Sequence, residues 1–147
     1  MIEIKEIHSE KDFNGDFTRE QFIDFLYEHL DKFGDPKDAI NNCLSYAFSD
    51  EPGKGGFALA AFEDGKLLGA LIHNKIRTEG YIPTNILVYV AVHRDARGKG
   101  LGRKLCEKCI EMCDGDVKLH VEYDNPAKRL YERIGFTNKY AEMRFTK

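Results

Sequence analysis

Hydrophobic positions recur along the chain with two different periods, and each change of period marks a boundary between expected elements. Residues 2–7 alternate in part between apolar and polar side chains, which predicts a first strand. Residues 22–33 and 39–48 place their apolar side chains three or four positions apart, which predicts two helices. Thr18 and Gln21 have the spacing of a capping box, so the first of these helices is expected to begin just after Thr18.

The middle of the chain is rich in expected strands. Residues 57–63 and 66–75 flank Asp64-Gly65, a dipeptide typical of a tight hairpin turn, and are therefore expected to pair antiparallel. Residues 85–92 are almost continuously apolar, which favours a central strand over an edge strand. Between the two expected helices, Gly34 is predicted to end the first, Asp35 to cap the second and Pro36 to open it.

The last third of the chain alternates between helical and strand patterns. It predicts a helix over 101–114, a strand over 117–123, a helix over 126–134 and one or more strands from Phe136 onward. The complete order of elements predicts an α/β fold with a mixed central sheet. The length of 147 residues and the hydrophobic content of 42% suit one domain spanning residues 1–147.

Charge and hydropathy exclude several classes of protein. The chain has 22 basic and 25 acidic residues and a net charge of -3, which argues against nucleic acid as a partner. No apolar run reaches the roughly 18 residues of a membrane span. The first residues also lack the basic start and apolar core of a signal peptide. The sequence therefore predicts no membrane partner and a cytoplasmic location.

Four cysteines stand at positions 43, 106, 109 and 113, three of them in one expected helix. This distribution does not resemble a disulfide framework, so reduced thiols are expected. The Cys-x-x-Cys-x-x-x-Cys spacing is also compatible with a metal or iron–sulfur site. However, these three positions share one helix face with Leu105 and Met112, which favours burial in the core and no metal.

The segment from Val90 to Gly102 runs from the apolar strand into a glycine-spaced basic turn and then directly into a helix. Glycines at 98, 100 and 102 allow a ligand to approach the backbone closely, at a helix N-terminus that favours anions. Arg97, Lys99 and Arg103 add full positive charges, so a diphosphate is the expected ligand. The spacing matches neither the dinucleotide fingerprint nor the P-loop. A tight turn with a solvated basic flank is the alternative.

Two motifs together resemble those of the GNAT superfamily of N-acetyltransferases. The first is Arg97-Gly98-x-Gly100-x-Gly102, and the second is the run Asp124-Asn125-Pro126-Ala127 followed by Leu130-Tyr131 and Gly135-Phe136. The resemblance implies a GNAT-like mixed sheet whose central strands, 85–92 and 117–123, splay apart, flanked by about four helices. It also implies acetyl-CoA as cosubstrate, its pantetheine arm lying in the gap. The implied cofactor-binding residues are Val90, Ala91, Val92, Arg97, Gly98, Lys99, Gly100, Leu101, Gly102, Arg103 and either Asp124 or Asn125.

The resemblance also assigns chemical roles for acetyl transfer to an amine. Tyr131 stands where the family places the acid that protonates the leaving thiolate, and the backbone around Val92 would meet the thioester carbonyl. His120 and Glu122 alternate onto one face of the strand expected over 117–123, so either could act as the general base. A water molecule could serve instead. Alternatively, His120 and Glu122 are simply polar residues on the solvent-exposed face of a half-buried strand, which gives the same alternation.

The implied function is transfer of an acetyl group to a primary amine, on a small molecule or a protein, by direct attack in a ternary complex. Carboxylates in the first two expected helices could attract that amine, although a solvated helix face has the same composition; they are Asp24, Glu28, Asp31, Asp35 and Asp38. A non-catalytic acyl-CoA-binding sensor or partner module is the alternative function. A nucleotide-binding protein is a third, which the spacing disfavours. A homodimer formed through the C-terminal segment is also compatible with the sequence.

Overall fold

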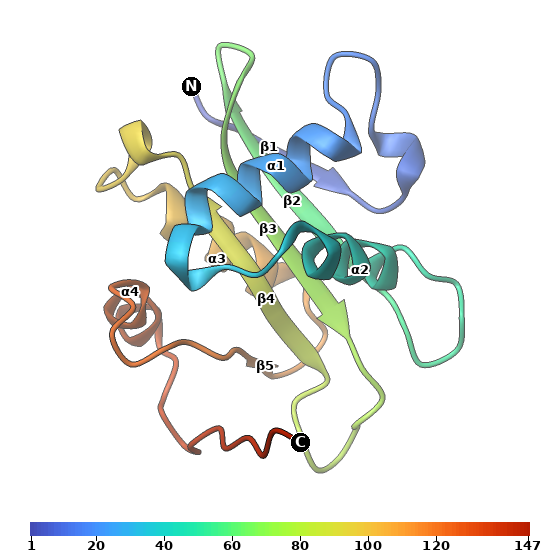
Figure 1. The fold of residues 1–147 in the computed structure, drawn as a ribbon, viewed down its shortest axis with the longest axis vertical. Helices are drawn as coiled ribbons and strands as arrows, with labels where there is room; N and C mark the ends of the chain where they lie inside the picture. The colour runs from blue at the N-terminus through green and yellow to red at the C-terminus, as the bar shows by residue number, and fades with distance from the viewer.

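Five strands form one mixed sheet in the computed structural model, which describes residues 1–147 (Figure 1). The strands lie in chain order across the sheet, and neighbouring strands are antiparallel except for the last pair, which is parallel. This arrangement confirms the expected α/β fold with a mixed sheet. The strands are β1 (Glu3–Ile7), β2 (Gly56–Glu63), β3 (Lys66–Lys75), β4 (Asn85–Val92) and β5 (Val117–Lys118).

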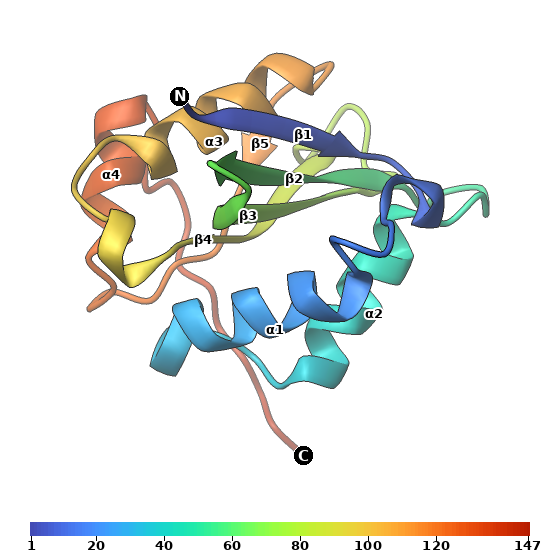
Figure 2. The same ribbon diagram turned by 90° about the horizontal axis from the view of Figure 1, so that it is seen from above.

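Four α-helices cover the two faces of the sheet (Figure 2). One face packs against α1 (Arg19–Leu30) and α2 (Lys37–Ala47), and the other against α3 (Leu101–Met112) and α4 (Ala127–Ile134). Each face has its own hydrophobic cluster, because successive side chains of a strand point to opposite sides of the sheet. Short 3₁₀ turns occupy η1 (Glu10–Asp12), η2 (Asp31–Phe33) and η3 (Arg94–Ala96). None of the helices has the length and apolar content that crossing a membrane requires.

Local signals in the sequence correspond closely to local structure. The Thr18 hydroxyl accepts from the Gln21 backbone N–H at 3.1 Å, and the Gln21 side chain accepts from the Thr18 N–H at 2.9 Å, which confirms the capping box. Asp64 and Gly65 have φ angles of 52° and 77°. Positive φ at both central residues is the type I′ geometry that suits the twist of a hairpin, so the turn between β2 and β3 is confirmed.

Strand β4 is continuous with β3 on one side but loses its neighbour on the other. Ile72 pairs with Tyr89 and His73 with Leu87, so Val88 is an extra residue that forms a β-bulge in β4. On the opposite side, only Asn85 and Ile86 pair with β5. The rest of β4 therefore has an unpaired edge, and the chain after β5 diverges from it. This divergence is the splay that positions the candidate site.

The predictions for two strands in the last third of the chain are wrong. The strand predicted over 117–123 ends at Lys118, and no strand forms after Phe136. Beyond Lys118 the chain moves away from β4 and has no partner for a hydrogen-bonded ladder. Strand β5 therefore has only two residues, which is too short an edge to pair with a final strand. The apolar side chains of that final segment, on Tyr140, Met143 and Phe145, are accordingly 81–89% exposed.

Smaller differences concern helix boundaries. Asp35 does not cap α2, because its carboxylate accepts a hydrogen bond from Tyr89 and Pro36 takes the N-cap position. Helix α1 ends at Leu30 and continues as a 3₁₀ turn to Phe33, so the periodicity extends beyond the α-helix itself. Helix α3 ends two residues before the expected Asp114.

Candidate functional site

The glycine-spaced turn connects β4 to α3 through η3. Gly98 and Gly100 have φ angles of 78° and 83°, in the region that side-chain-bearing residues rarely adopt. A Cβ atom at either position would meet nothing within 4 Å. The turn therefore requires glycine for its backbone conformation, and its outer surface stays open to a ligand.

The backbone N–H groups from Gly98 to Arg103 donate no hydrogen bond within the protein. The first donor of the helix that is satisfied is Lys104, whose N–H reaches the Gly100 carbonyl at 3.1 Å. Gly100 is the N-cap of α3 and has no side chain that could cap it. Unpaired N–H groups and the positive end of the helix dipole are together the features that favour an anion at a helix N-terminus.

The three cationic residues expected around this turn, Arg97, Lys99 and Arg103, differ in whether they already have partners within the protein. The Arg97 guanidinium donates to the backbone carbonyls of Val92 at 3.2 Å and His29 at 2.8 Å, and so fastens the end of α1 to the end of β4. Arg103 lies 3.2 Å from the Glu107 carboxylate on the next helical turn. Both positive charges remain beside the turn, but these side chains already have partners within the protein.

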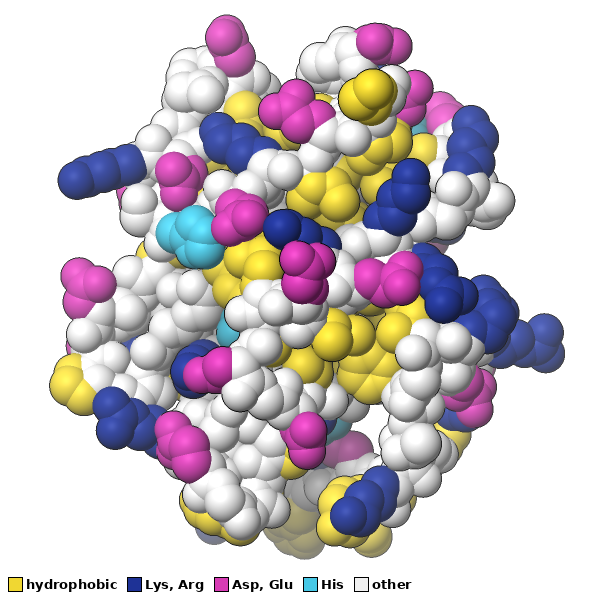
Figure 3. All heavy atoms as spheres, turned by 180° about the vertical axis from the view of Figure 1, so that it is seen from behind, with side chains coloured by type: hydrophobic (Ala, Val, Ile, Leu, Met, Phe, Trp, Pro, Cys, Tyr) yellow, Lys and Arg dark blue, Asp and Glu magenta, His cyan; other side chains and the backbone are white.

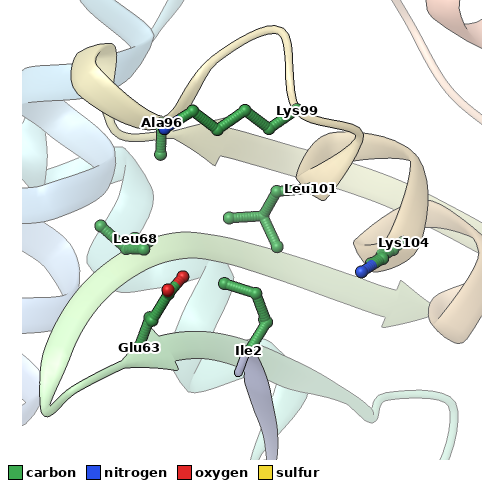
Figure 4. Close-up of a pocket in the computed structure, with 7 residues that line it drawn as sticks. All are labelled: Ile2, Glu63, Leu68, Ala96, Lys99, Leu101 and Lys104. Carbon is green, nitrogen blue, oxygen red and sulfur yellow. The ribbon is translucent and has the colours of Figure 1, made fainter.

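Lys99 extends back along the turn toward Ala96, over a small pocket of about 120 Å³ (Figure 4). This pocket lies between the turn and the β2–β3 hairpin. It is lined by Ile2, Glu63, Leu68, Ala96, Lys99, Leu101 and Lys104. On the face of the molecule opposite α1 and α2, acidic and basic side chains are interspersed (Figure 3).

The unpaired edge of β4 presents backbone groups to the gap. The His93 N–H donates to the Leu68 carbonyl of β3 at 2.8 Å. Because N–H groups alternate between the two sides of a strand, those of Val90 and Val92 point away from β3 and toward the gap, whereas that of Ala91 points toward β3. Of the three strand residues expected at the cofactor site, Val90 and Val92 thus offer a free donor there.

Gly102 brings α3, α4 and β4 into close contact. A Cβ atom at Gly102 would lie 3.3 Å from Leu130 Cδ2 and 3.6 Å from Val92 Cγ2, so a larger residue would push the start of α3 away from α4 and β4. Glycine at this position keeps the start of α3 against both elements.

Tyr131 is 8% exposed and lies in the hydrophobic cluster between α3, α4 and the sheet. Its ring packs against Phe136 in a T-shaped arrangement at 5.9 Å between centroids. Burial, with a smaller contribution from Cys106, raises the pKa of the phenol well above its usual value. The buried polar atoms without a partner are Nδ1 of His29 and of His73, so the Tyr131 hydroxyl retains contact with solvent. Tyr131 thus offers a neutral, unpaired O–H donor.

The remaining expected site residues lie between β5 and α4. The Asn125 side-chain oxygen accepts from the Ala127 N–H at 2.9 Å, which satisfies a donor at the start of α4. Asp124 is exposed, with its carboxylate 3.8 Å from the Lys32 ammonium. His120 and Glu122 are exposed and belong to no strand, so the structure does not place them on a shared strand face. Asn125 is therefore occupied by a structural hydrogen bond, and Asp124 has the freer side chain.

An open groove of about 980 Å³ runs along α1, η2 and the start of α2. Four of the five carboxylates singled out from the sequence line it, and Asp38 does not; the four are Asp24, Glu28, Asp31 and Asp35. Three cations, Lys32, Lys37 and Arg94, also line the groove. Asp24 pairs with Lys37 at 2.9 Å. The groove is thus acidic in balance and reaches η3, the element that precedes the glycine turn.

Tyr89 connects the wall of this groove to the sheet. Its hydroxyl donates to Asp35 Oδ2 at 2.5 Å, and burial, followed by this bond, raises the pKa of the phenol. We expect Tyr89→Phe to lower the free energy of unfolding by about 1 kcal/mol, the net value of one such hydrogen bond, because the exposed Asp35 carboxylate regains water. Urea unfolding measures this. Tyr27→Phe, at a half-exposed position in the same groove, is the control and should change stability by less than about 0.5 kcal/mol.

Sequence reasoning missed a pair of histidines whose rings lie in contact beside the turn. The rings of His29 and His93 lie 4.4 Å apart between centroids, and Phe25 packs on His29 at 4.5 Å. His29 is 6% exposed and its Nδ1 has no partner. Burial, reinforced by His93, lowers the pKa of His29, while Glu28 opposes the shift and Arg94 and Arg97 add to it. No local pattern signals this pair, because the two residues are 64 positions apart in the chain.

The lowered pKa of His29 predicts a loss of stability in acid. A histidine that is buried and neutral binds fewer protons in the folded state than in the unfolded state. Above the unfolded pKa of about 6.5 this difference vanishes and His29 does not lower the free energy of unfolding; below that pH the free energy of unfolding falls as the pH drops. We expect the urea midpoint of the wild type to decline below about pH 6.5 more steeply than that of His29→Gln. His120→Gln, at an exposed histidine, should follow the wild type. Parallel curves for wild type and His29→Gln would contradict the prediction.

The cysteines lie largely where helical periodicity predicts. Cys106 and Cys109 are buried in the core between α3 and the sheet, Cys43 and Cys113 are partly exposed, and all four thiols are free. No group of three or more His, Cys, Asp or Glu side chains is arranged to hold a metal ion.

Comparisons with known proteins agree with this architecture. Residues 11–136 match the model of the acetyltransferase (GNAT) family. Ribosomal-protein-alanine N-acetyltransferase from Brucella melitensis biovar Abortus 2308 has a similar structure, with a TM-score of 0.70, 19% identity and full coverage of both chains.

Two aminoglycoside acetyltransferases are also similar in structure. Aminoglycoside N-acetyltransferase AAC(6')-Iy in complex with CoA has a TM-score of 0.68 and 14% identity over 100% of this chain and 95% of its own. The enzyme HMB0005 from an uncultured soil metagenomic sample has a TM-score of 0.67 and 18% identity, over 100% and 99% of the two chains. The search of curated proteins finds no match for the sequence. At these identities the likeness concerns the fold.

Proposed function

The chain belongs to the acetyltransferase (GNAT) family, and from that premise we propose that it transfers an acetyl group from acetyl-CoA to a primary amine by direct attack in a ternary complex. The observation that carries this proposal is the unbroken row of free N–H groups from Gly98 to Arg103, at the helix end next to the unpaired edge of β4.

The glycine turn suits the diphosphate of acetyl-CoA. Its N–H groups point outward, and a Cβ at Gly98 or Gly100 would meet open space, so a phosphate can approach the backbone. Arg97 and Arg103 supply positive charge close by. We assign Gly98, Lys99, Gly100, Leu101, Gly102 and Arg103 to phosphate binding and Arg97 to holding the turn against α1. Asp124 or Asn125 would contact the cofactor further along, and Asp124 has the side chain that is free to do so.

The free edge of β4 suits the pantetheine arm and the thioester. Amide groups of pantetheine can pair with the backbone of Val90 to Val92, as a further strand would. The N–H of Val92 or Val90 would donate to the thioester carbonyl, whose oxygen gains negative charge as the amine attacks. Backbone donors of a packed strand need no reorganisation for this role.

Tyr131 suits the role of the acid that protonates the departing thiolate. Its hydroxyl has no partner in the protein and its raised pKa keeps the proton in place at neutral pH. The amine must first lose a proton, because a lysine-like ammonium has a pKa of about 10.4. His120, Glu122 or a water molecule would accept it. The exposed positions of His120 and Glu122 leave these three alternatives open.

The acidic groove along α1 and η2 suits a cationic acceptor. Its carboxylates would attract an ammonium group, which then loses its proton at the reaction centre. A small amine and a protein amino group both satisfy this chemistry.

Isothermal titration with acetyl-CoA, CoA and ATP tests the cofactor assignment. We expect binding of both CoA compounds and none of ATP, followed by release of free CoA thiol when an amine library is added. Binding without thiol release from any amine would favour the sensor function, and absence of binding would overturn both functions. ATP competing with CoA would favour a nucleotide-binding protein.

A further inference from the structure

A buried histidine–amide pair lies where β3 and β4 run side by side, at the end of the sheet away from the glycine turn. His73 Nε2 is 2.8 Å from Asn85 Oδ1, and the Asn85 amide donates to the Asp116 carbonyl at 3.3 Å. The two residues are 3% and 1% exposed, and the Phe57 ring stacks on the imidazole at 4.3 Å. Because Asn85 Oδ1 accepts at Nε2, that nitrogen carries the proton and the opposite nitrogen, Nδ1, has a free lone pair.

The free nitrogen of His73 faces no hydrogen-bond partner, although it is fully buried. A buried polar atom without a partner is costly and calls for an explanation. Cys113, the partly exposed thiol at the C-cap of α3, packs against the same apolar cluster as Phe57, whose ring stacks on His73. The Lys75–Asp114 ion pair holds this end of α3 beside β3, so the thiol lies close to the imidazole. The order of groups is thus thiol, imidazole and amide, with the imidazole oriented by the amide. In that order a histidine serves as the base of a nucleophilic cysteine.

A second thiol accompanies this site one helical turn earlier. Cys109 is fully buried and lies next to Cys113. Residues four apart on a helix have Cβ atoms about 5–6 Å apart, and a disulfide needs about 4 Å. Cys113 has extended dihedral angles and lies just outside the helix, so formation of the disulfide requires this end of the helix to move.

We propose that Cys113, His73 and Asn85 form a second reactive site, at which the Cys113 thiol is oxidised by peroxides and Cys109 then resolves the oxidised sulfur as a disulfide. The site is separate from the proposed cofactor site, because Asn85 and Val92 are the two ends of β4 and about 23 Å of strand lies between them. The proposal therefore does not rest on the acetyltransferase function.

The chemistry balances with peroxide as the oxidant. The Cys113 thiolate attacks one peroxide oxygen, so an S–O bond forms, the O–O bond breaks, and the departing hydroxide takes the proton that His73 held. Sulfur loses two electrons and peroxide gains them. The Cys109 sulfur then attacks Cys113, an S–S bond forms, the S–O bond breaks, and the leaving hydroxide takes the Cys109 proton. The products are one disulfide and two water molecules.

The surroundings favour the thiolate at Cys113 and the thiol at Cys109. A hydrogen bond from Cys109 and the nearby His73 lower the pKa of Cys113, against burial and the Asp114 charge. The contact with Cys113, together with burial, raises the pKa of Cys109. Asp114 is itself paired with Lys75 at 2.8 Å, which reduces its influence on the thiolate. Burial raises the pKa of Cys43 to about 12, so this partly exposed thiol provides a control within the same chain.

Alkylation rates of individual cysteines against pH provide the first test. The full chain is reduced, treated with iodoacetamide between acidic and basic pH, and analysed by peptide mass spectrometry. We expect the rate at Cys113 to be half-maximal below pH 7, whereas an ordinary thiol is half-maximal at about pH 8.5. Cys43 should react only above that pH. The shape of the curve is the readout, because a thiolate of low pKa is also intrinsically less nucleophilic.

Variants test whether the His73 imidazole is the cause of the low midpoint of the Cys113 curve. His73→Gln should raise the midpoint of the Cys113 curve by about one pH unit or more, and His8→Gln, at an exposed histidine, should leave it unchanged. If His73→Gln fails to fold, the wild-type curve still decides. A Cys113 midpoint at or above that of an ordinary thiol would overturn the proposal.

Peroxide treatment provides the second test. With hydrogen peroxide as the probe, we expect wild type to lose two hydrogens in intact mass and to yield a cross-linked Cys109–Cys113 peptide. Cys109→Ser should stop at the sulfenic acid and form an adduct with dimedone at Cys113, and Cys113→Ser should form neither product. A dimedone adduct on Cys43 in preference to Cys113, or no oxidation of Cys113, would contradict the inference.

Discussion

Replacing Tyr131 by phenylalanine is expected to lower kcat for acetyl transfer about 100-fold, the usual contribution of a positioned acid, while the Kd for acetyl-CoA changes by less than about twofold. The phenol is buried among apolar side chains and its hydroxyl has no partner in the protein. Phenylalanine fills the same space, so packing and cofactor binding are retained. What is lost is the proton that the leaving thiolate would take. Steady-state assays of thiol release, combined with titration calorimetry, separate the two quantities.

A control variant distinguishes this effect from a general loss of stability. Tyr81→Phe removes a hydroxyl from an exposed tyrosine in the β3–β4 loop and should leave kcat and Kd unchanged. If Tyr131→Phe retains the wild-type kcat, the leaving group takes its proton from water, and Tyr131 is a packing residue of α4. If Kd and kcat change together, the hydroxyl contributes to cofactor binding.

The parts of the fold that the sequence predicts well depend on short stretches of chain. Asp64-Gly65 specifies its turn because both residues tolerate positive φ, and Thr18 with Gln21 marks a helix start through hydrogen bonds between neighbours. The glycine turn at 98–102 is equally local, since its backbone angles and the helix that follows it can be expected from five consecutive residues. For these features the physical cause is contained in the pattern itself.

The parts that the sequence does not predict depend on distant segments. Residues 119–123 alternate as a strand does, but the strand needs a partner, and the bulge at Val88 and the divergence after Lys118 remove it. The exposed positions of His120 and Glu122 follow from that loss. A pattern of side chains indicates which face of a segment is apolar, and it does not specify whether a neighbouring backbone lies within hydrogen-bonding distance.

The histidine sites show the same limit within the sheet. His73 pairs with Leu87, so Asn85 is its diagonal neighbour on the same face of β3 and β4. That relation depends on the register, which the bulge at Val88 shifts by one residue. His29 meets His93 only because α1 packs over the end of β4 and Arg97 fastens them together. Isolated histidines in a sequence therefore carry little information until the register and helix packing are known.

Charge at the centre of the glycine turn offers the sharpest test of phosphate binding. Asn and Asp have nearly the same shape and both tolerate positive φ, so Gly100→Asn and Gly100→Asp differ mainly by one negative charge. We expect Gly100→Asp to bind acetyl-CoA about 10- to 100-fold more weakly than Gly100→Asn, because a carboxylate several ångströms from a phosphate costs about 1.4–3 kcal/mol in this partly solvated setting. Titration calorimetry of the two variants measures the difference.

Stability should change in the opposite direction to affinity in this pair. A negative charge at the N-terminus of a helix interacts favourably with the unpaired N–H groups, so Gly100→Asp should unfold at a urea midpoint equal to or above that of Gly100→Asn. Weaker binding by the more stable variant cannot arise from partial unfolding. The affinity difference should also shrink at high salt, because screening weakens repulsion between exposed charges. Equal affinities of the two variants at low salt would place the phosphates away from the start of α3.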